Sequence, residues 1–219
     1  MKIVATFNIY NEVQFIREAV ESVLWCDKII IVDGAFEGFP TSDGKPQSND
    51  GTLEILEELN QKHHNKMIVL NLQYFSKGLE KVHVCLSQVH LGEYFLHMNG
   101  DEVFEGDFVG VRKHIATYTL PMYQIKEYKV GDENDWYWMA KILLKTPTLR
   151  FNGRHVVRTN TFDPTYRFEG ERGAVVPIEA NLPFGRIRHL KSQRTKERKQ
   201  QNQRWLDYYY SHQFKEIVL

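Results

Sequence analysis

The hydrophobic and polar positions of the first hundred residues alternate between two periods. Unbroken apolar runs indicate strands buried on both faces, and apolar residues three or four apart indicate amphipathic helices. The predicted strands are KIVATF (2–7), KIIIVDG (28–34), KMIVLNL (66–72) and EYFLHM (93–98), and the predicted helices span 11–25, 49–61 and 76–91. This β-α-β-α-β-α-β order predicts an α/β fold with a mainly parallel sheet flanked by helices.

The alternation fades after Asp107. Further helices are predicted at 107–118 and 193–214, and further strands at 122–130 and 136–145. We therefore expect a single domain of three parts, namely an α/β half at 1–107, a smaller mixed half at 108–192 and a C-terminal helical arm at 193–219.

The composition is that of an ordinary folded protein. The 219 residues carry 28 basic and 28 acidic side chains and are 42% hydrophobic, unlike a disordered or nucleic-acid-coating chain. Cys26 and Cys85 stand in unrelated contexts, so we expect two reduced thiols. The N-terminal apolar run is too short for a signal peptide or a membrane span, which predicts a cytoplasmic location.

Positive charge gathers near the C-terminus. Residues 186–204 hold eight lysines and arginines and one glutamate. This stretch has no interleaved aromatic residues before Trp205, so we expect a solvated helical face and no nucleic-acid partner. Peripheral contact with a membrane stays open, although no strongly apolar face accompanies the charge and no transmembrane segment is predicted.

Polar side chains follow three of the predicted strands. Ligands of open parallel sheets bind beyond the carboxyl ends of the strands, and these ends carry Asn8, Tyr10, Glu12, Asp33, Asn99, Asp101 and Glu102. Adjacent carboxylates repel each other unless solvent, hydrogen bonds or a cation intervenes, so Asp101 and Glu102 indicate a site for Mn²⁺ or Mg²⁺. Gly100 would let the backbone approach a ligand. A plain hairpin is the alternative, because Asn-Gly-Asp is also a good turn sequence.

Four segments resemble, in order and spacing, the nucleotide-binding half of family 2 glycosyltransferases with the GT-A fold. They are FNIYNEVQFIREAVESV, IIIVDGA, SNDGT and GEYFLHMNGDE, and the resemblance covers roughly residues 1–107. It implies transfer of a sugar from a nucleotide-diphosphate donor to an acceptor hydroxyl, with inversion at the anomeric carbon. A UDP-sugar is the favoured donor, and a glycan or lipid-linked glycan is the expected acceptor.

The resemblance also implies roles for particular residues. Asn8, Tyr10, Glu12, Asp33 and Asn99 would border the nucleotide, whereas we expect Asp50 to cap its helix. The metal would be held by Asp101 and His189, and the leaving diphosphate would be neutralised by Lys191 and Arg194.

The sequence departs from the family pattern at three places. Asn99 replaces the first aspartate of the metal motif and removes one negative charge. An additional segment, 36–47, separates two of the motifs and could form a lid or an acceptor loop. The glutamate expected after His155 is missing, so Glu169, Glu171 and His155 itself are the candidates for the catalytic base.

Two alternatives to sugar transfer stay open. A sugar nucleotidyltransferase would need a glycine-rich basic loop after the first strand, and FNIYNEVQF has neither glycine nor lysine. A non-catalytic sugar-nucleotide-binding module is favoured by Asn99 and by the missing glutamate. Trp136 and Trp138 could stack on an acceptor sugar, although at least one aromatic ring of this strand should pack in the core.

Overall fold

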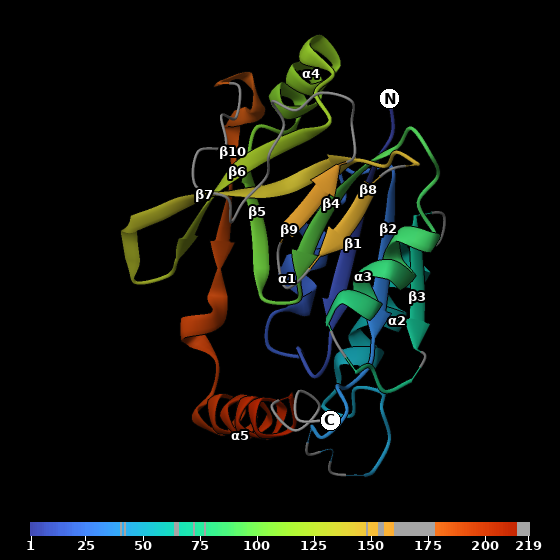
Figure 1. The fold of residues 1–219 in the computed structure, drawn as a ribbon, viewed down its shortest axis with the longest axis vertical. Helices are drawn as coiled ribbons and strands as arrows, with labels where there is room; N and C mark the ends of the chain where they lie inside the picture. Colours follow the sequence, from blue (N-terminus) through green and yellow to red (C-terminus); the bar gives the residue numbers. More distant parts are fainter. Residues whose placement is uncertain are drawn as a thin grey trace.

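The computed structural model describes residues 1–39, 41, 43–63, 66–71, 73–76, 78–147, 149–152, 156–159 and 178–213. Within these residues, eight strands form one mixed sheet in the order β3-β2-β1-β4-β7-β6-β10-β5, and β8 and β9 form a separate ribbon. Helices lie on both faces of the sheet, which makes the protein an α/β fold (Figure 1).

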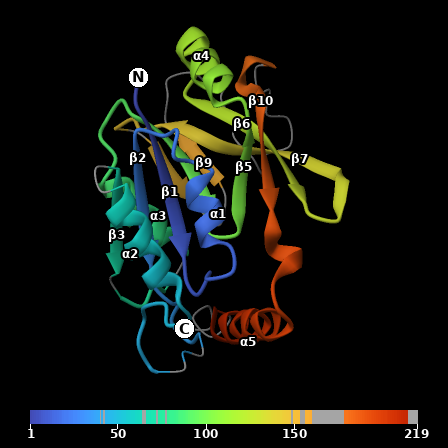
Figure 2. The same ribbon diagram turned by 180° about the vertical axis from the view of Figure 1, so that it is seen from behind.

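The first half has the predicted parallel arrangement. Its strands are β1 (Ile3–Ile9), β2 (Lys28–Asp33), β3 (Met67–Asn71) and β4 (Tyr94–Asn99). Its helices are α1 (Ile16–Glu21), α2 (Thr52–Lys62) and α3 (Gly78–Ser87). Alternate residues of β1 face opposite sides: Phe7 packs in the cluster that contains residues of α1 and α2, and Val4 packs with Cys85 of α3. The two views show these helices on opposite faces (Figures 1 and 2).

Helix α1 is shorter than the sequence pattern predicts. It begins at Ile16, because the residues after β1 follow an irregular path and Asn11 adopts a left-handed conformation with φ of 52°. The turn at residues 10–12 is thereby left free to bond the next loop of the chain.

The second half completes the same sheet with mixed pairings. Its elements are β5 (Glu102–Gly106), α4 (Phe108–Tyr118), β6 (Met122–Lys129), β7 (Asp132–Leu144), β8 (Leu149–Asn152), β9 (Val156–Thr159), β10 (Asn181–His189) and α5 (Lys196–Gln213), with short 3-10 turns at Ile178–Ala180 and Leu190–Gln193. Four strand pairs of the sheet are parallel and three are antiparallel. The parallel part is therefore the first half together with the β6–β10 pair.

The Asn-Gly-Asp segment forms a turn but no hairpin. It joins β4 to β5, yet β7, β6 and β10 lie between these two strands in the sheet. Strand β5 pairs instead with β10, in antiparallel register, with Glu102 opposite His189. The turn therefore brings its polar residues next to the end of a strand that is far away in sequence.

Helix α5 lies across the carboxyl ends of the parallel strands (Figures 1 and 2). Trp205 stacks on Phe36 with ring centroids 4.7 Å apart, which fixes the helix to the segment after β2. Among the described helices, none is both long and apolar enough to cross a membrane.

Candidate active site

The loops after β1 and β2 are joined by hydrogen bonds through Asp33. This buried carboxylate accepts hydrogen bonds from the backbone N–H of Ser48 at 2.8 Å and from its hydroxyl at 2.5 Å. The Ser48 hydroxyl in turn accepts a bond from the N–H of Asn11, and Asn11 and Asn49 exchange two bonds. Burial raises the pKa of Asp33 despite the bonds from Ser48. Asp33, predicted to bind the base, holds its own loop in this structure.

Asp50 stabilises the start of α2 from the position before the N-cap, which is Gly51, whereas the sequence predicted Asp50 itself as the cap. Its Oδ1 accepts from the N–H of Thr52, the first residue of the helix, and its Oδ2 accepts from the N–H of Val13. The Thr52 hydroxyl accepts from the N–H of Glu12 at 2.8 Å. These hydrogen bonds from the SNDGT segment therefore fix the backbone at Glu12.

Tyr10 and the residues around it form a small aromatic group under α5. The Tyr10 ring is buried against Phe39, with centroids 5.1 Å apart in an edge-on contact. Its hydroxyl has no hydrogen-bond partner among the described residues, and burial raises the pKa of Tyr10 to about 12. Asn8 lies half-buried at the end of β1, and its side-chain oxygen accepts a weak contact from the Cys85 thiol at 3.6 Å.

Lys81 of α3 is a buried cation that the sequence did not indicate. Its ammonium donates to the carbonyl of Ile9 at 2.7 Å and lies 4.7 Å from the centre of the Phe36 ring. Burial lowers the pKa of Lys81 to about 8. Helical spacing alone did not reveal this role, because a single lysine within an amphipathic helix normally faces solvent.

Within the turn after β4, two hydrogen bonds join Asn99 to the carboxylate of Glu102. Asn99 donates to Glu102 from its backbone N–H at 3.0 Å and from its side-chain amide at 2.7 Å. A Cβ atom at Gly100 would lie 2.7 Å from Cγ of Glu12, so the glycine is needed for close contact with a side chain of the protein itself. The sequence predicted the close approach but assigned it to a ligand.

A β-bulge places a buried lysine between two buried carboxylates. The register of β6 and β7 shifts so that Tyr123 faces Ile142 and Gln124 faces Ala140, which leaves Lys141 as the additional residue. Its ammonium lies 2.6 Å from Glu102 and 3.3 Å from Glu127. Burial by itself lowers the pKa of Lys141, but the two carboxylates outweigh it and raise the pKa.

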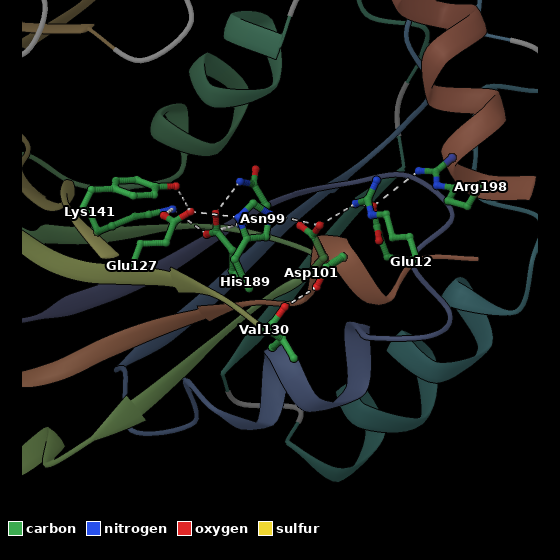
Figure 3. Close-up of polar contacts among 12 residues, drawn as sticks. Glu12, Asn99, Asp101, Glu127, Val130, Lys141, His189 and Arg198 are labelled. Atoms are coloured by element: carbon green, nitrogen blue, oxygen red, sulfur yellow. Dashed lines mark hydrogen bonds and ion pairs between the residues drawn. The ribbon is translucent and has the colours of Figure 1, made fainter. Parts of the chain in front are cut away.

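His189 bridges the turn and β6 (Figure 3). Its Nε2 lies 3.3 Å from Asp101 and its Nδ1 lies 3.0 Å from Glu127, which also accepts from the Tyr137 hydroxyl at 2.6 Å. Burial by itself lowers the pKa of His189, but the bonds to the two carboxylates raise it to about 9. Burial raises the pKa of Glu127, but the bond from His189 and the charge of Lys141 lower it to about 2. The imidazole is therefore protonated at neutral pH.

Two arginines from the start of the C-terminal arm reach the same edge. Arg194 bridges Glu12 at 2.6 Å and Asp101 at 3.0 Å, and Arg198 lies 3.5 Å from Glu12 and donates to the carbonyl of Tyr10. Burial, partly offset by Arg194, raises the pKa of Glu12 to about 7. Lys191, which was predicted to neutralise the diphosphate together with Arg194, has an exposed side chain.

The charges of this cluster balance without a metal ion. The carboxylates Glu12, Asp101, Glu102 and Glu127 are paired with the cations Lys141, His189, Arg194 and Arg198. Glu102, Glu127 and His189 offer ligand atoms within 4.8 Å of one another, but the ammonium of Lys141 bonds both carboxylates.

The residues present do not fit a divalent ion at Asp101. Both ring nitrogens of His189 already contact carboxylates, Nε2 at 3.3 Å from Asp101 and Nδ1 at 3.0 Å from Glu127, so neither nitrogen is left to ligate an ion. Asp101 also forms an ion pair with Arg194, with Oδ2 and Nη2 3.0 Å apart. The cations of the protein itself thus occupy the positions at which the sequence predicted Mn²⁺ or Mg²⁺.

Several predicted residues fall outside this cluster. His155, Glu169 and Glu171, the candidates for the catalytic base, lie outside the described residues. Trp136 and Trp138 contact each other edge-on at 5.9 Å, and Lys126 lies 3.9 Å from the centre of the Trp136 ring. Because side chains alternate along a strand, both tryptophans face away from Tyr137 and its partner Glu127.

The comparisons with known proteins find similarity only at the level of structure. No protein-family model and no curated protein sequence matches the chain significantly. Matched structures include TarS from S. aureus in complex with UDP (TM-score 0.48, 23% identity, 60% of this chain and 37% of TarS 1-349). They also include the mannosyltransferase PcManGT from Pyrobaculum calidifontis in complex with GDP-Man and Mn²⁺ (0.43, 15%, 59% and 35%). A third is mannose-6-phosphate isomerase from Helicobacter pylori (0.37, 11%, 62% and 53%).

The matched regions span 35% to 53% of these three chains, so the similarity is partial as well as distant. PcManGT carries a name of the class that the sequence resemblance indicates, and the isomerase carries the name of another class. Similarity of this kind does not transfer an activity, because one fold carries many functions.

Proposed function

We propose that the protein transfers a sugar from a nucleoside-diphosphate donor to an acceptor hydroxyl. The observation that carries this proposal is the group of three cations, His189, Arg194 and Arg198, at the carboxyl end of the parallel strands beside the aromatic group of Tyr10. Phosphate-bearing ligands of open α/β sheets bind at this edge. Aromatic rings suit the base and ribose, and guanidinium groups suit a diphosphate.

The chemistry follows from where charge develops. The bond between the anomeric carbon and the diphosphate breaks as the acceptor oxygen attacks, and negative charge grows on the leaving phosphate. Fixed cations at that position stabilise the transition state more than the ground state, which is how the site would accelerate the reaction. His189 is held in place by Asp101 and Glu127, so little reorganisation is needed.

Several finer features of the proposal come from the sequence resemblance. They are inversion at the anomeric carbon, a UDP-sugar as donor, and a glycan or lipid-linked glycan as acceptor. The same holds for a catalytic base among His155, Glu169 and Glu171. Assistance by Mn²⁺ or Mg²⁺, which the resemblance also implies, is not part of the proposal, because the cations around Asp101 already pair with its carboxylate.

A non-catalytic sugar-nucleotide-binding module is the second candidate. It is favoured by the pairing of all four carboxylates of the cluster with cations, because a carboxylate whose charge is so neutralised is a weak base.

Release of nucleoside diphosphate distinguishes the two candidates. The protein would be incubated with UDP-, GDP- and dTDP-sugars in separate arms with Mn²⁺, Mg²⁺ or EDTA, and the liberated diphosphate would be measured. We expect one donor to bind and to release diphosphate above background. Binding without release in every arm would favour the binding module, and absence of binding to all donors would contradict both.

A further inference from the structure

Two half-buried arginines present buried hydrogen-bond donors that no described residue accepts. Nε of Arg194 and both Nε and Nη1 of Arg198 are buried without a partner, as is the hydroxyl of Tyr10. The Arg198 guanidinium lies 5.7 Å from the centre of the Tyr10 ring and 5.2 Å from that of Phe39. Buried polar groups are nearly always hydrogen-bonded, so a cluster of unpaired donors indicates a bound acceptor.

The unpaired donors belong to two guanidinium groups that share one carboxylate. Arg194 and Arg198 both contact Glu12, at 2.6 Å and 3.5 Å, and the buried N–H groups named above have no partner among the described residues. The acceptor that fits is therefore an anion, and the planar fork of a guanidinium matches the oxygens of a phosphate.

Arg198 was not among the residues that the sequence singled out. It stands in the first turn of α5, where a run of basic side chains predicted a solvated face. In the folded protein its guanidinium donates to the carbonyl of Tyr10. Figure 3 shows Arg198 extending from α5 toward Glu12.

We propose that Arg198, together with Arg194, binds the diphosphate of the donor directly, so that binding requires no metal ion. This inference rests on the proposed function. The two guanidinium groups exchange their contacts with Glu12 for contacts with phosphate oxygens. Glu12 then acts as an internal competitor that holds both arginines in place before the donor arrives.

Calorimetric titration of the full chain with inorganic pyrophosphate tests this inference, in parallel arms with EDTA and with Mn²⁺. We expect equal affinity in both arms. Arg198→Gln should weaken binding by about tenfold or more, as for loss of a charge-assisted hydrogen bond. Arg204→Gln is the matched control, because Arg204 is exposed on the same helix and should leave the affinity unchanged.

A second variant tests the inference in the opposite direction, so that misfolding of Arg198→Gln cannot by itself account for both results. Glu12→Gln keeps the shape of the side chain but removes the competing charge, so pyrophosphate should bind more tightly. Binding that needs Mn²⁺, an unchanged affinity in Arg198→Gln, or weaker binding in Glu12→Gln would each overturn the inference. Titration with nucleoside diphosphates in the same arms distinguishes a failure of this inference from a failure of the proposed function. Binding that occurs only with Mn²⁺ would contradict this inference and leave the proposed function standing. Absence of binding in every arm would contradict the proposed function as well.

Discussion

Single residues at the sheet edge derive their chemistry from their immediate neighbours. His189 and Glu12 are the clearest cases, because two carboxylates raise the pKa of the histidine and burial raises that of the glutamate. Both groups bind protons more tightly in the folded than in the unfolded protein. Each therefore contributes stability that is lost as the pH rises.

The pH dependence of unfolding should reveal the charged state of His189. Its folded pKa of about 9 exceeds the ordinary value of 6.5, so its contribution is fully present below about pH 6.5 and is lost as the pH rises through about 9. At about 1.4 kcal/mol per pH unit, the loss is on the order of 3 kcal/mol. Urea denaturation across this window should show a smaller decline for His189→Gln than for the wild type.

The exposed His90 provides the control for this measurement. His90→Gln should follow the wild-type curve. An unchanged slope in His189→Gln would mean that the imidazole is neutral in the folded protein, and it would reopen the possibility of a metal at this position.

Lys141 offers a second prediction at this scale. Lys141→Met removes the only ammonium that the described residues place between Glu102 and Glu127, and leaves two buried carboxylates close together. Breaking a buried pair in this way typically costs about 3–5 kcal/mol. Thermal unfolding should show a large drop in Tm at neutral pH, and Lys129→Met, at an exposed position of β6, should not. A drop no larger than that of the control would contradict the pairing.

Whole elements place these residues, and α5 is the element that closes the site. It reaches the parallel strands through Arg198 in its first turn. About two turns further along the helix, Trp205 stacks on Phe36. Phe36 belongs to the segment 36–47, which the sequence marked as a possible lid. In this structure Phe36 of the segment stacks on Trp205 and so links the C-terminal helix to the chain after β2.

Removal of the Trp205 ring should release α5 from this position. In Trp205→Ala, hydrogen exchange of the α5 backbone should accelerate, and donor affinity should fall because Arg198 is no longer held over Tyr10. Trp136→Ala removes the same kind of ring from the distant β7 and serves as the control. Unchanged exchange in α5 would show that the stack with Phe36 does not anchor the helix.

The whole molecule joins both halves of the chain in one sheet. The turn after β4 leads into β5 at the sheet edge, and β10 returns beside it, so that Asp101 of the first half and His189 of the second come within 3.3 Å. The charged cluster therefore exists only when the mixed half is folded onto the parallel half. This arrangement explains why the basic C-terminal stretch and the acidic remainder of the chain meet at a balanced site.

The sequence by itself determined the α/β order of the first half, because the period of apolar residues reports directly which faces are buried. It also singled out Asn99, Asp101, His189 and Arg194, since strand ends and short motifs are local features; the roles assigned to these residues stay predictions. The predictions failed for β5 and β10, which are short or interrupted by proline, glycine and charges, so that pairing with distant strands decides their structure.

Only the tertiary structure decided what these residues contact. Arg194 pairs with Glu12 across 182 positions and Lys141 with Glu102 across 39, and Asp33 is occupied by Ser48. The protonation states of His189 and Glu12 follow from the same long-range contacts. Electrostatic energy depends on separation and burial in space, neither of which the spacing of residues along the chain records.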